Sequence, residues 1–194
     1  ILSCRKMCYT QRMIIIWIIA IFLVGWFVLT YNSFIRGKNR YTEAWADIEV
    51  QLKRRYDLIP NLVSTVKGYA THESTAFEKV TEARSRAMQA SSLQDHASAE
   101  ENLGKAVTGL FGIAEAYPDL KANTNFIELQ RELSDSENKI QAARRFYNGV
   151  VRDFNTHLQS VPSNIIGKMF GFKSADFFDL PDGDAAQQSV EVKF

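Results

Sequence analysis

Histidines are the first side chains to test for catalysis or metal binding, and their spacing here supports neither. His72, His96 and His157 share no common interval. His72-Glu73 begins like the zinc-protease motif H-E-x-x-H, but alanine stands at position 76 where the second histidine would be. The sequence also lacks a Glu-x-x-His pair, a phosphate-binding glycine loop and a G-x-S-x-G nucleophile turn. We therefore expect a non-enzymatic protein with no catalytic residue, no metal site and no cofactor.

Charged residues at helix positions that should be apolar are more informative. Arg55 occupies one slot of an apolar helical pattern, and Gln130, Glu137 and Arg144 recur every seven residues beside the apolar seam of a later helix. They form either a partly solvated flank, with arginine stems over the core, or a buried polar layer that fixes helix register. A buried Arg55 would need a carboxylate partner. Arg55 and Glu137 each lie near the middle of their helix, and the middles of two antiparallel helices lie side by side. We predict that Arg55 and Glu137 come within salt-bridge distance and are largely buried.

Long helices must position these residues. A 3-4-3-4 apolar rhythm runs from Trp45 to Tyr69, and Pro60 inside it should kink the helix without ending it. Two further amphipathic helices follow, and Tyr117-Pro118 ends the second of them. The last helix has the clearest seam, in which apolar residues recur at seven-residue intervals: Phe126, Leu133, Ile140, Tyr147 and Phe154. No β pattern competes, so the predicted fold is all-α, an antiparallel bundle of about four long helices occupying residues 32–160.

An uncharged stretch from Met13 to Tyr31 precedes this bundle. As a helix its 19 residues would span about 28 Å, close to the thickness of the bilayer hydrocarbon. Trp17, Trp26 and Tyr31 suit the membrane interface. A buried core helix and a cleaved signal peptide are the alternatives, but bulky residues stand where a small-x-small cleavage site should follow. We predict an uncleaved transmembrane helix, 13–31, that continues into the first bundle helix with at most a modest bend near Gly37.

Bulk composition limits the remaining function classes. A formal net charge of +1 argues against a general nucleic-acid binder. Both cysteines, Cys4 and Cys8, precede the anchor, so neither a disulfide nor a cysteine-based metal site can brace the bundle. The sequence opens on Ile1, so Met7 and Met13 are the candidate start residues, and residues 1–12 form a flank that would not be native if translation begins at Met13.

A short aromatic segment, 161–178, follows the last long helix. We expect it to fold back onto the bundle; alternatively it lies on the bilayer or on a neighbouring subunit. Its phenylalanines make a candidate interaction surface: Phe170, Phe172, Phe177 and Phe178. Beyond it, residues 179–194 are expected to be a polar, mobile tail.

Several long runs of this sequence closely resemble the LemA family. They are AWADIEVQLKRRYDLIPNLVSTVKGYATHE (44–73), EARSRA (82–87), EAYPDLKAN-x-NF (115–126), LQRELSDSENKI (129–140), ARRFYN (143–148) and FGFK (170–173). The resemblance implies one membrane helix followed by a helical domain in a bacterial membrane protein. It brings no established enzymatic activity and no assigned catalytic residues. A relative in magnetosome membranes adds a hint of membrane organisation, by analogy alone.

The function we expect is that of a membrane-anchored, non-catalytic scaffold that self-associates or docks other membrane proteins. The alternatives are a regulatory subunit of a membrane protease or transporter, and an enzyme with an unrecognised site on the bundle. The expected partners are the lipid bilayer and either a second copy of the chain or other membrane proteins, with no nucleic acid. Arg36, Lys38 and Arg40 follow the anchor, so the positive-inside rule places the bundle in the cytoplasm if Met13 is the start. If Arg5, Lys6 and Arg12 are present, the two flanks balance.

Overall fold

A computed structural model describes the backbone of residues 2–178 and the side chains from Arg12 to Phe178. This part of the chain contains helices and no strands, which confirms the all-α prediction. The helices are α1 (Leu2–Lys67), α2 (Ser74–Gln89), α3 (Leu93–Ala114), α4 (Pro118–Lys121), α5 (Thr124–Gln159) and α6 (Ser163–Met169). The predicted mobile tail, 179–194, and the side chains of Cys4 and Cys8 lie outside the described residues.

Helix α1 is continuous through residues 32–40, where a linker would have appeared as an interruption. It also continues through Pro60, which lacks the N–H that would bond to the carbonyl of Tyr56. The guanidinium of Arg84, on α2, donates from Nε to that carbonyl oxygen at 2.7 Å. Because a neighbouring helix satisfies the carbonyl left open by the proline, the helix can tolerate Pro60 in its interior.

The described residues form two compact units, and each is considered by itself. The anchor unit consists of residues 2–42 and 150–175. The bundle unit consists of residues 43–149 and 176–178.

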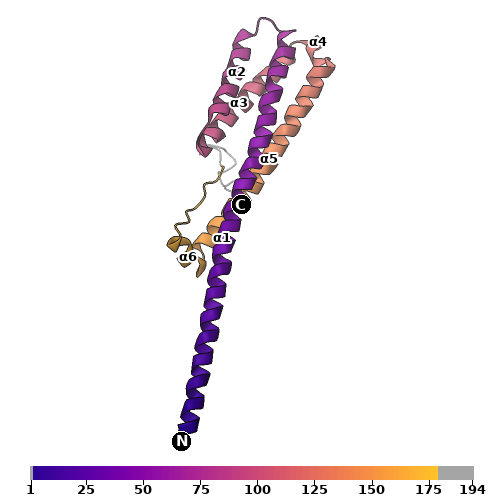
Figure 1. The fold of residues 1–194 in the computed structure, drawn as a ribbon. Coiled ribbons are helices and arrows are strands. Elements are labelled where there is room, and N and C mark those ends of the chain that lie inside the picture. Colours follow the sequence, from indigo (N-terminus) through magenta and orange to yellow (C-terminus); the bar gives the residue numbers. More distant parts are fainter. Residues whose placement is uncertain (1, 179–194) are drawn as a thin grey trace, which may run out of the picture. The chain divides into compact units, whose positions relative to one another are not determined.

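In the bundle unit, α1 and α5 run antiparallel. Contacts pair early residues of one helix with late residues of the other: the rings of Trp45 and Tyr147 are 5.7 Å apart, and Arg55 meets Glu137. Near the end of α1, the side-chain amide of Asn123 donates to the hydroxyl of Tyr69. Helices α2 and α3 pack on each other beside this pair (Figure 1). The core is formed by the apolar seams predicted for the long helices, including Ile48, Leu52, Leu103, Val107, Leu133 and Ile140.

Local sequence signals set most helix ends. Ser92 caps α3 by accepting a hydrogen bond from the backbone N–H of Asp95 at 3.0 Å, and Pro118 occupies the first turn of α4. The side chain of Asn123 accepts from the backbone N–H of Phe126 at 3.1 Å, which satisfies a free donor at the start of α5. Helix α2 is the exception, because it begins at Ser74 with Glu73 at the cap position and no side-chain cap.

The anchor unit has a small aromatic core made by residues distant in sequence. Phe34, Phe154 and Ile166 are each at most 5% exposed and pack together. The ring of Phe34 lies 6.2 Å from that of Phe154 and stacks on Phe172 at 5.0 Å. Gly37 allows the close approach of α5, since a Cβ there would lie 2.9 Å from Phe154 Cδ2. The part of α1 that directly follows the bilayer-length stretch is therefore covered by the end of α5 and by the chain after α5.

The C-terminal aromatic segment is divided between the two units. Residues 161–175 belong to the anchor unit, where Asn155 exchanges two hydrogen bonds, each 2.9 Å, with the backbone of Ala175. In the bundle unit, Asn148 exchanges two hydrogen bonds with the backbone of Phe178 at 2.8 and 3.2 Å. The segment folds back as expected, with 161–175 packed on the parts of α1 and α5 in the anchor unit and 176–178 on the bundle unit.

Candidate functional site in the helical bundle

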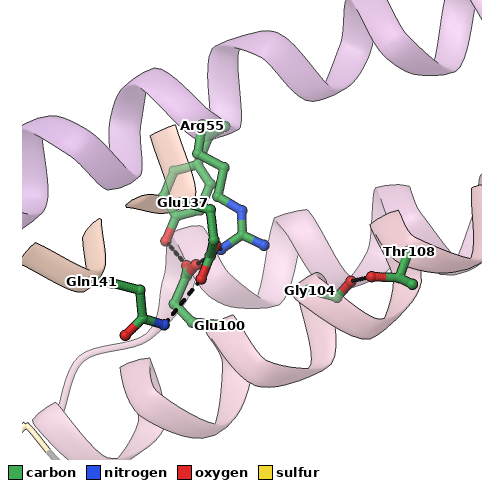
Figure 2. A network of polar contacts seen from close by, with 7 residues as sticks. Arg55, Glu100, Gly104, Thr108, Glu137 and Gln141 are labelled. Atoms are coloured by element: carbon green, nitrogen blue, oxygen red, sulfur yellow. Dashed lines mark hydrogen bonds and ion pairs between the residues drawn. The ribbon is translucent and has the colours of Figure 1, made fainter. Parts of the chain in front are cut away.

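A cluster of charged and hydroxyl groups lies inside the bundle unit, between α1, α3 and α5. Arg55 Nη1 lies 2.9 Å from Glu137 Oε2 and 3.2 Å from Glu100 Oε2. The hydroxyl of Tyr56 donates to Glu100 Oε1, so both oxygens of this carboxylate are engaged. Figure 2 shows Arg55 reaching from α1 to both carboxylates, and Gln141 donating to Glu137 from the same helix. The result is a connected network rather than a single ion pair.

Burial shifts the pKa values of Glu100 and Tyr56 in this cluster. The side chains of Arg55 and Glu100 are 8% and 9% exposed, whereas that of Glu137 is 44% exposed. Burial raises the pKa of Glu100 above its ordinary value, although the Tyr56 hydrogen bond and the charge of Arg55 act in the opposite direction. Burial, and then the charge of Glu100, raise the pKa of the Tyr56 hydroxyl well above its usual range. Tyr56 therefore remains a protonated donor at any physiological pH.

The cluster forms the floor of a groove between α3 and α5 with a volume of about 800 Å³. Five of the side chains that line it are apolar, and most of the others are charged, amide or hydroxyl groups, among them the Glu101–Lys105 ion pair. The apolar members are Val107, Phe111, Leu133, Ile140 and Phe178, and the polar ones include Thr108, Gln130, Ser134, Asn138 and Gln141. At one end of the groove, the guanidinium of Arg144 lies 4.7 Å from the centre of the Phe178 ring. A ligand in this groove would meet buried apolar side chains and the charged cluster at its base, with more exposed polar side chains beside them.

The sequence-predicted pair is present, but its environment differs from the prediction. Arg55 and Glu137 are within salt-bridge distance at 2.9 Å, and Arg55 is buried as expected. The predicted burial of Glu137 is wrong, since nearly half of its side chain is exposed because it stands at the groove. The heptad column to which it belongs, Gln130, Glu137 and Arg144, lines the groove, so this column is a partly solvated flank at the edge of a buried cluster.

Glu100 was missed by sequence reasoning, although it carried the same signal as Arg55. It lies three residues before Leu103, which begins the apolar face of α3 with Val107 and Leu110. A carboxylate therefore occupies an apolar slot of α3, as a cation does on α1. Two opposite charges at apolar slots of different helices predict a buried ion pair, and this pattern would have found Glu100.

The histidines do not come together as a site. His72 is exposed, His96 packs edge-on against Trp45 at 5.5 Å, and His157 lies over Phe34 at 4.5 Å. Among residues 12–178, no group of three or more His, Cys, Asp or Glu side chains is placed to hold a metal ion. The two partly buried histidines therefore act as core aromatic rings.

Within the described part of the chain, one helix is long and apolar enough to cross a membrane, and the rest of the protein covers almost none of this stretch. Of the predicted interface residues, Trp17 is 63% exposed, whereas Trp26 packs against the Phe34 cluster and Tyr31 contacts Phe170 and Phe172. The core helix of a soluble protein would instead be mostly buried by the rest of the chain.

The candidate interaction surface is only partly available. Phe170 and Phe177 are 47% and 42% exposed, and Phe172 is half-buried on α1. Phe178 is 1% exposed, because it packs against Trp45 with ring centres 5.5 Å apart. Its assignment to an exposed surface is wrong; it is a core residue of the bundle unit.

Comparison with known proteins finds relatives that are named as magnetosome proteins and as a LemA protein. Magnetosome protein MamQ 2 of Paramagnetospirillum magneticum is 24% identical over 184 residues, covering 81% of this chain and 68% of the relative. Magnetosome protein MamQ of Magnetospirillum gryphiswaldense is 24% identical over the same shares of both chains. Protein LemA of Metamycoplasma hominis is 25% identical over 170 residues, covering 84% of this chain and 76% of the relative. The LemA family model matches residues 44–194, which includes the entire α3–α5 groove, and the chain therefore belongs to the LemA family.

Proposed function

We propose that this protein is a membrane-anchored, non-catalytic scaffold that docks a helical segment of another membrane protein in the groove between α3 and α5. The observation that carries the proposal is the groove itself, which brings apolar side chains together with a charged floor whose members already satisfy one another. The apolar stretch of α1 supplies the anchor, and the names of the magnetosome relatives fit a role at membranes.

The groove has dimensions that suit a short helix. Its lining runs from residue 100 to 111 on α3 and from 130 to 144 on α5. At 1.5 Å per residue these stretches are about 17 and 21 Å long, the length of a helix of three to four turns. An amphipathic helix binds in a groove by laying its apolar face against apolar side chains, and this groove is lined by Val107, Phe111, Leu133 and Ile140 together with polar groups.

The charged floor supports binding rather than catalysis. Arg55 is held by two carboxylates, and Glu100 accepts from both Arg55 and Tyr56. A general acid or base must direct a proton or a lone pair at the reacting group, whereas these groups are directed at one another. The floor therefore acts in this proposal as a rigid support that sets the width of the groove.

Site-specific photo-crosslinking in cells tests the proposal. A photoreactive amino acid at Thr108 or Ser134, both exposed on the groove walls, should give the same discrete crosslinked partner. The matched control is the exposed Lys53 on α1, which is outside the groove. The Thr108→Trp substitution, which fills the groove, should abolish crosslinking from position 134. Equal crosslinking from Lys53, or crosslinking unaffected by Thr108→Trp, would show that the groove is not the docking site.

An enzyme or small-molecule receptor is the second candidate, favoured by the volume of the hollow and by the raised pKa of Glu100. The two candidates differ in what they require of Glu100. A ligand that binds this carboxylate should raise the melting temperature of the full chain in a metabolite screen, and Glu100→Gln should remove that rise. A docking groove should retain its crosslinked partner in Glu100→Gln, because its walls are unchanged.

The proposed location is the cell membrane, with a single span and the bundle unit in the cytoplasm. Arg36, Lys38 and Arg40 follow the apolar stretch, and they favour the cytoplasmic side if translation begins at Met13, since Arg5, Lys6 and Arg12 would otherwise balance them. In this orientation the groove would recruit cytoplasmic segments of membrane proteins, including a protease or transporter that the chain regulates, or a second copy of the chain.

A further inference from the structure

Helix α6 in the anchor unit is apolar on two faces, and only one of them is covered by protein. Ser163, Ile166 and Gly167 are buried, with Ile166 in the Phe34 cluster. Ile165 and Met169, four residues apart and therefore on one face of the helix, are 62% and 60% exposed. An exposed apolar face on a short helix usually meets a partner or a membrane.

Aromatic contacts fix the depth of this helix relative to the apolar stretch of α1. Phe170, directly after α6, has its ring 5.7 Å from that of Phe27 and 4.7 Å from that of Tyr31. Both partners belong to the apolar stretch 13–31 and are separated by about 6 Å along the helix axis. If this stretch spans the bilayer, Phe170 lies at the level of its last turn, where hydrocarbon gives way to headgroups.

The charge of the same region is one-sided. Residues 161–175 contain Lys168 and Lys173 and no aspartate or glutamate. The adjoining part of α1 is also free of acidic residues up to Glu43, and it carries Arg36, Lys38 and Arg40. A basic, apolar element beside a membrane span is complementary to anionic headgroups, which attract each nearby lysine or arginine.

We propose that α6 and Phe170 form a second membrane contact, lying in the interfacial layer of an anionic bilayer with Ile165 and Met169 directed into the lipid. The inference rests on the proposed membrane anchor. The chain would thus hold the bilayer at two points, the span itself and an interfacial helix that packs against its end. Such a contact restricts the tilt of the span, because α6 is fixed to α1 through Phe170 and Phe172.

Fluorescence quenching on the full chain in lipid vesicles tests the proposal. Cys4 and Cys8 are replaced by serine, and a single cysteine at Met169 carries an environment-sensitive probe. Nitroxide-labelled lipid should quench this probe, and aqueous iodide should not, in vesicles of phosphatidylcholine and phosphatidylglycerol. The matched control is a probe at Ile127, which is 51% exposed in the bundle unit and should give the opposite result. Lys168→Gln with Lys173→Gln should reduce lipid quenching several-fold in these vesicles and leave it unchanged in phosphatidylcholine alone.

The possible outcomes separate the inference from its premise. Alkaline carbonate should leave the protein in the membrane; release would overturn the anchor, and both proposals with it. Retention combined with iodide quenching at position 169 would overturn the α6 contact alone. A probe protected from both quenchers, and exposed to iodide when the protein is diluted with excess lipid, would show that a second copy covers this face and would also overturn it.

Discussion

Removing the positive charge from the buried cluster is the most direct test of how the bundle unit is held together. Arg55→Met keeps much of the apolar stem and leaves Glu100, 9% exposed, without its cation. Breaking a buried ion pair from one side destabilises by about 3–5 kcal/mol, since the remaining charge stays buried. Glu137 is 44% exposed and can be solvated by water, so it adds little to this loss.

The structure predicts a ranking among the single changes. Glu100→Leu leaves Arg55 paired with Glu137 but strands the hydroxyl of Tyr56, so we expect a loss of about 1–3 kcal/mol. Glu137→Leu leaves the Arg55–Glu100 pair intact and should change stability by less than about 1 kcal/mol. The double variant Arg55→Met with Glu100→Leu should be more stable than Arg55→Met alone, because no charge is left stranded.

Trp45 provides the assay. The chain has three tryptophans, and Trp17→Phe with Trp26→Phe leaves Trp45 as the fluorophore, packed against Tyr147 and Phe178 in the bundle unit. Urea unfolding of this full-length protein in detergent micelles, followed by Trp45 fluorescence, gives the free energy of unfolding of each variant. If the unfolding free energy of Arg55→Met is within about 1 kcal/mol of its parent's, or if Glu137→Leu is the more damaging change, the buried cluster does not hold the bundle together.

Three further predictions concern pH, packing and orientation. Because the pKa of Glu100 is raised on folding, its contribution to stability is fully present below the ordinary value of 4.5 and is lost as pH rises through the raised value. In the same urea titrations, the unfolding free energy of Glu100→Gln should lack this decline, and a pH dependence identical to that of the parent would contradict the assignment to Glu100. Gly37→Ala should destabilise the protein by about 1–3 kcal/mol, because the added Cβ would meet the ring of Phe154. The control Gly149→Ala, with open space around the added Cβ, should stabilise it by about 0.5–1 kcal/mol. Both are measured by urea unfolding followed by circular dichroism, and equal effects would show that the Phe154 ring moves freely. A cysteine at the exposed Ser91 should resist a membrane-impermeant thiol reagent in intact cells and react after lysis, and labelling of intact cells would place the bundle outside the cytoplasm.

Periodicity was sufficient to predict the long helices and their antiparallel pairing. The seven-residue seam of α5 forms the core where it was expected, since every one of Phe126, Leu133, Ile140 and Phe154 is buried. Arg55 could be recognised because a charge in an apolar slot conflicts with the pattern around it, and burial then requires a carboxylate within reach. Local patterns of this kind are set by a single helix and can therefore be read from the chain.

The identity of the buried partner depended on which helices face each other, and one helical pattern does not contain that information. Glu100 and Glu137 both lay near apolar seams, and only the arrangement of α3 against α1 makes Glu100 the buried one. The surface that the aromatic segment covers could not be identified from the sequence for a similar reason. Its contacts with Phe27, Tyr31 and Phe34 join residues more than a hundred positions apart, and hydrophobicity alone does not say which apolar surface such a segment will cover.

The distant partners of Phe34 have a consequence for biosynthesis. Phe34 leaves the ribosome early, but the residues that cover it, Phe154, Ile166 and Phe172, follow about 120 to 140 positions later. At ~5–20 residues per second, this interval lasts roughly 6–28 s. During that time the apolar stretch can already enter the bilayer while Phe34 remains uncovered. The anchor unit can therefore pack only after the residues up to Phe172 have been synthesised. Nascent chains truncated before Phe154 would insert into the membrane with an exposed aromatic surface, which chaperones would bind or proteases would cleave.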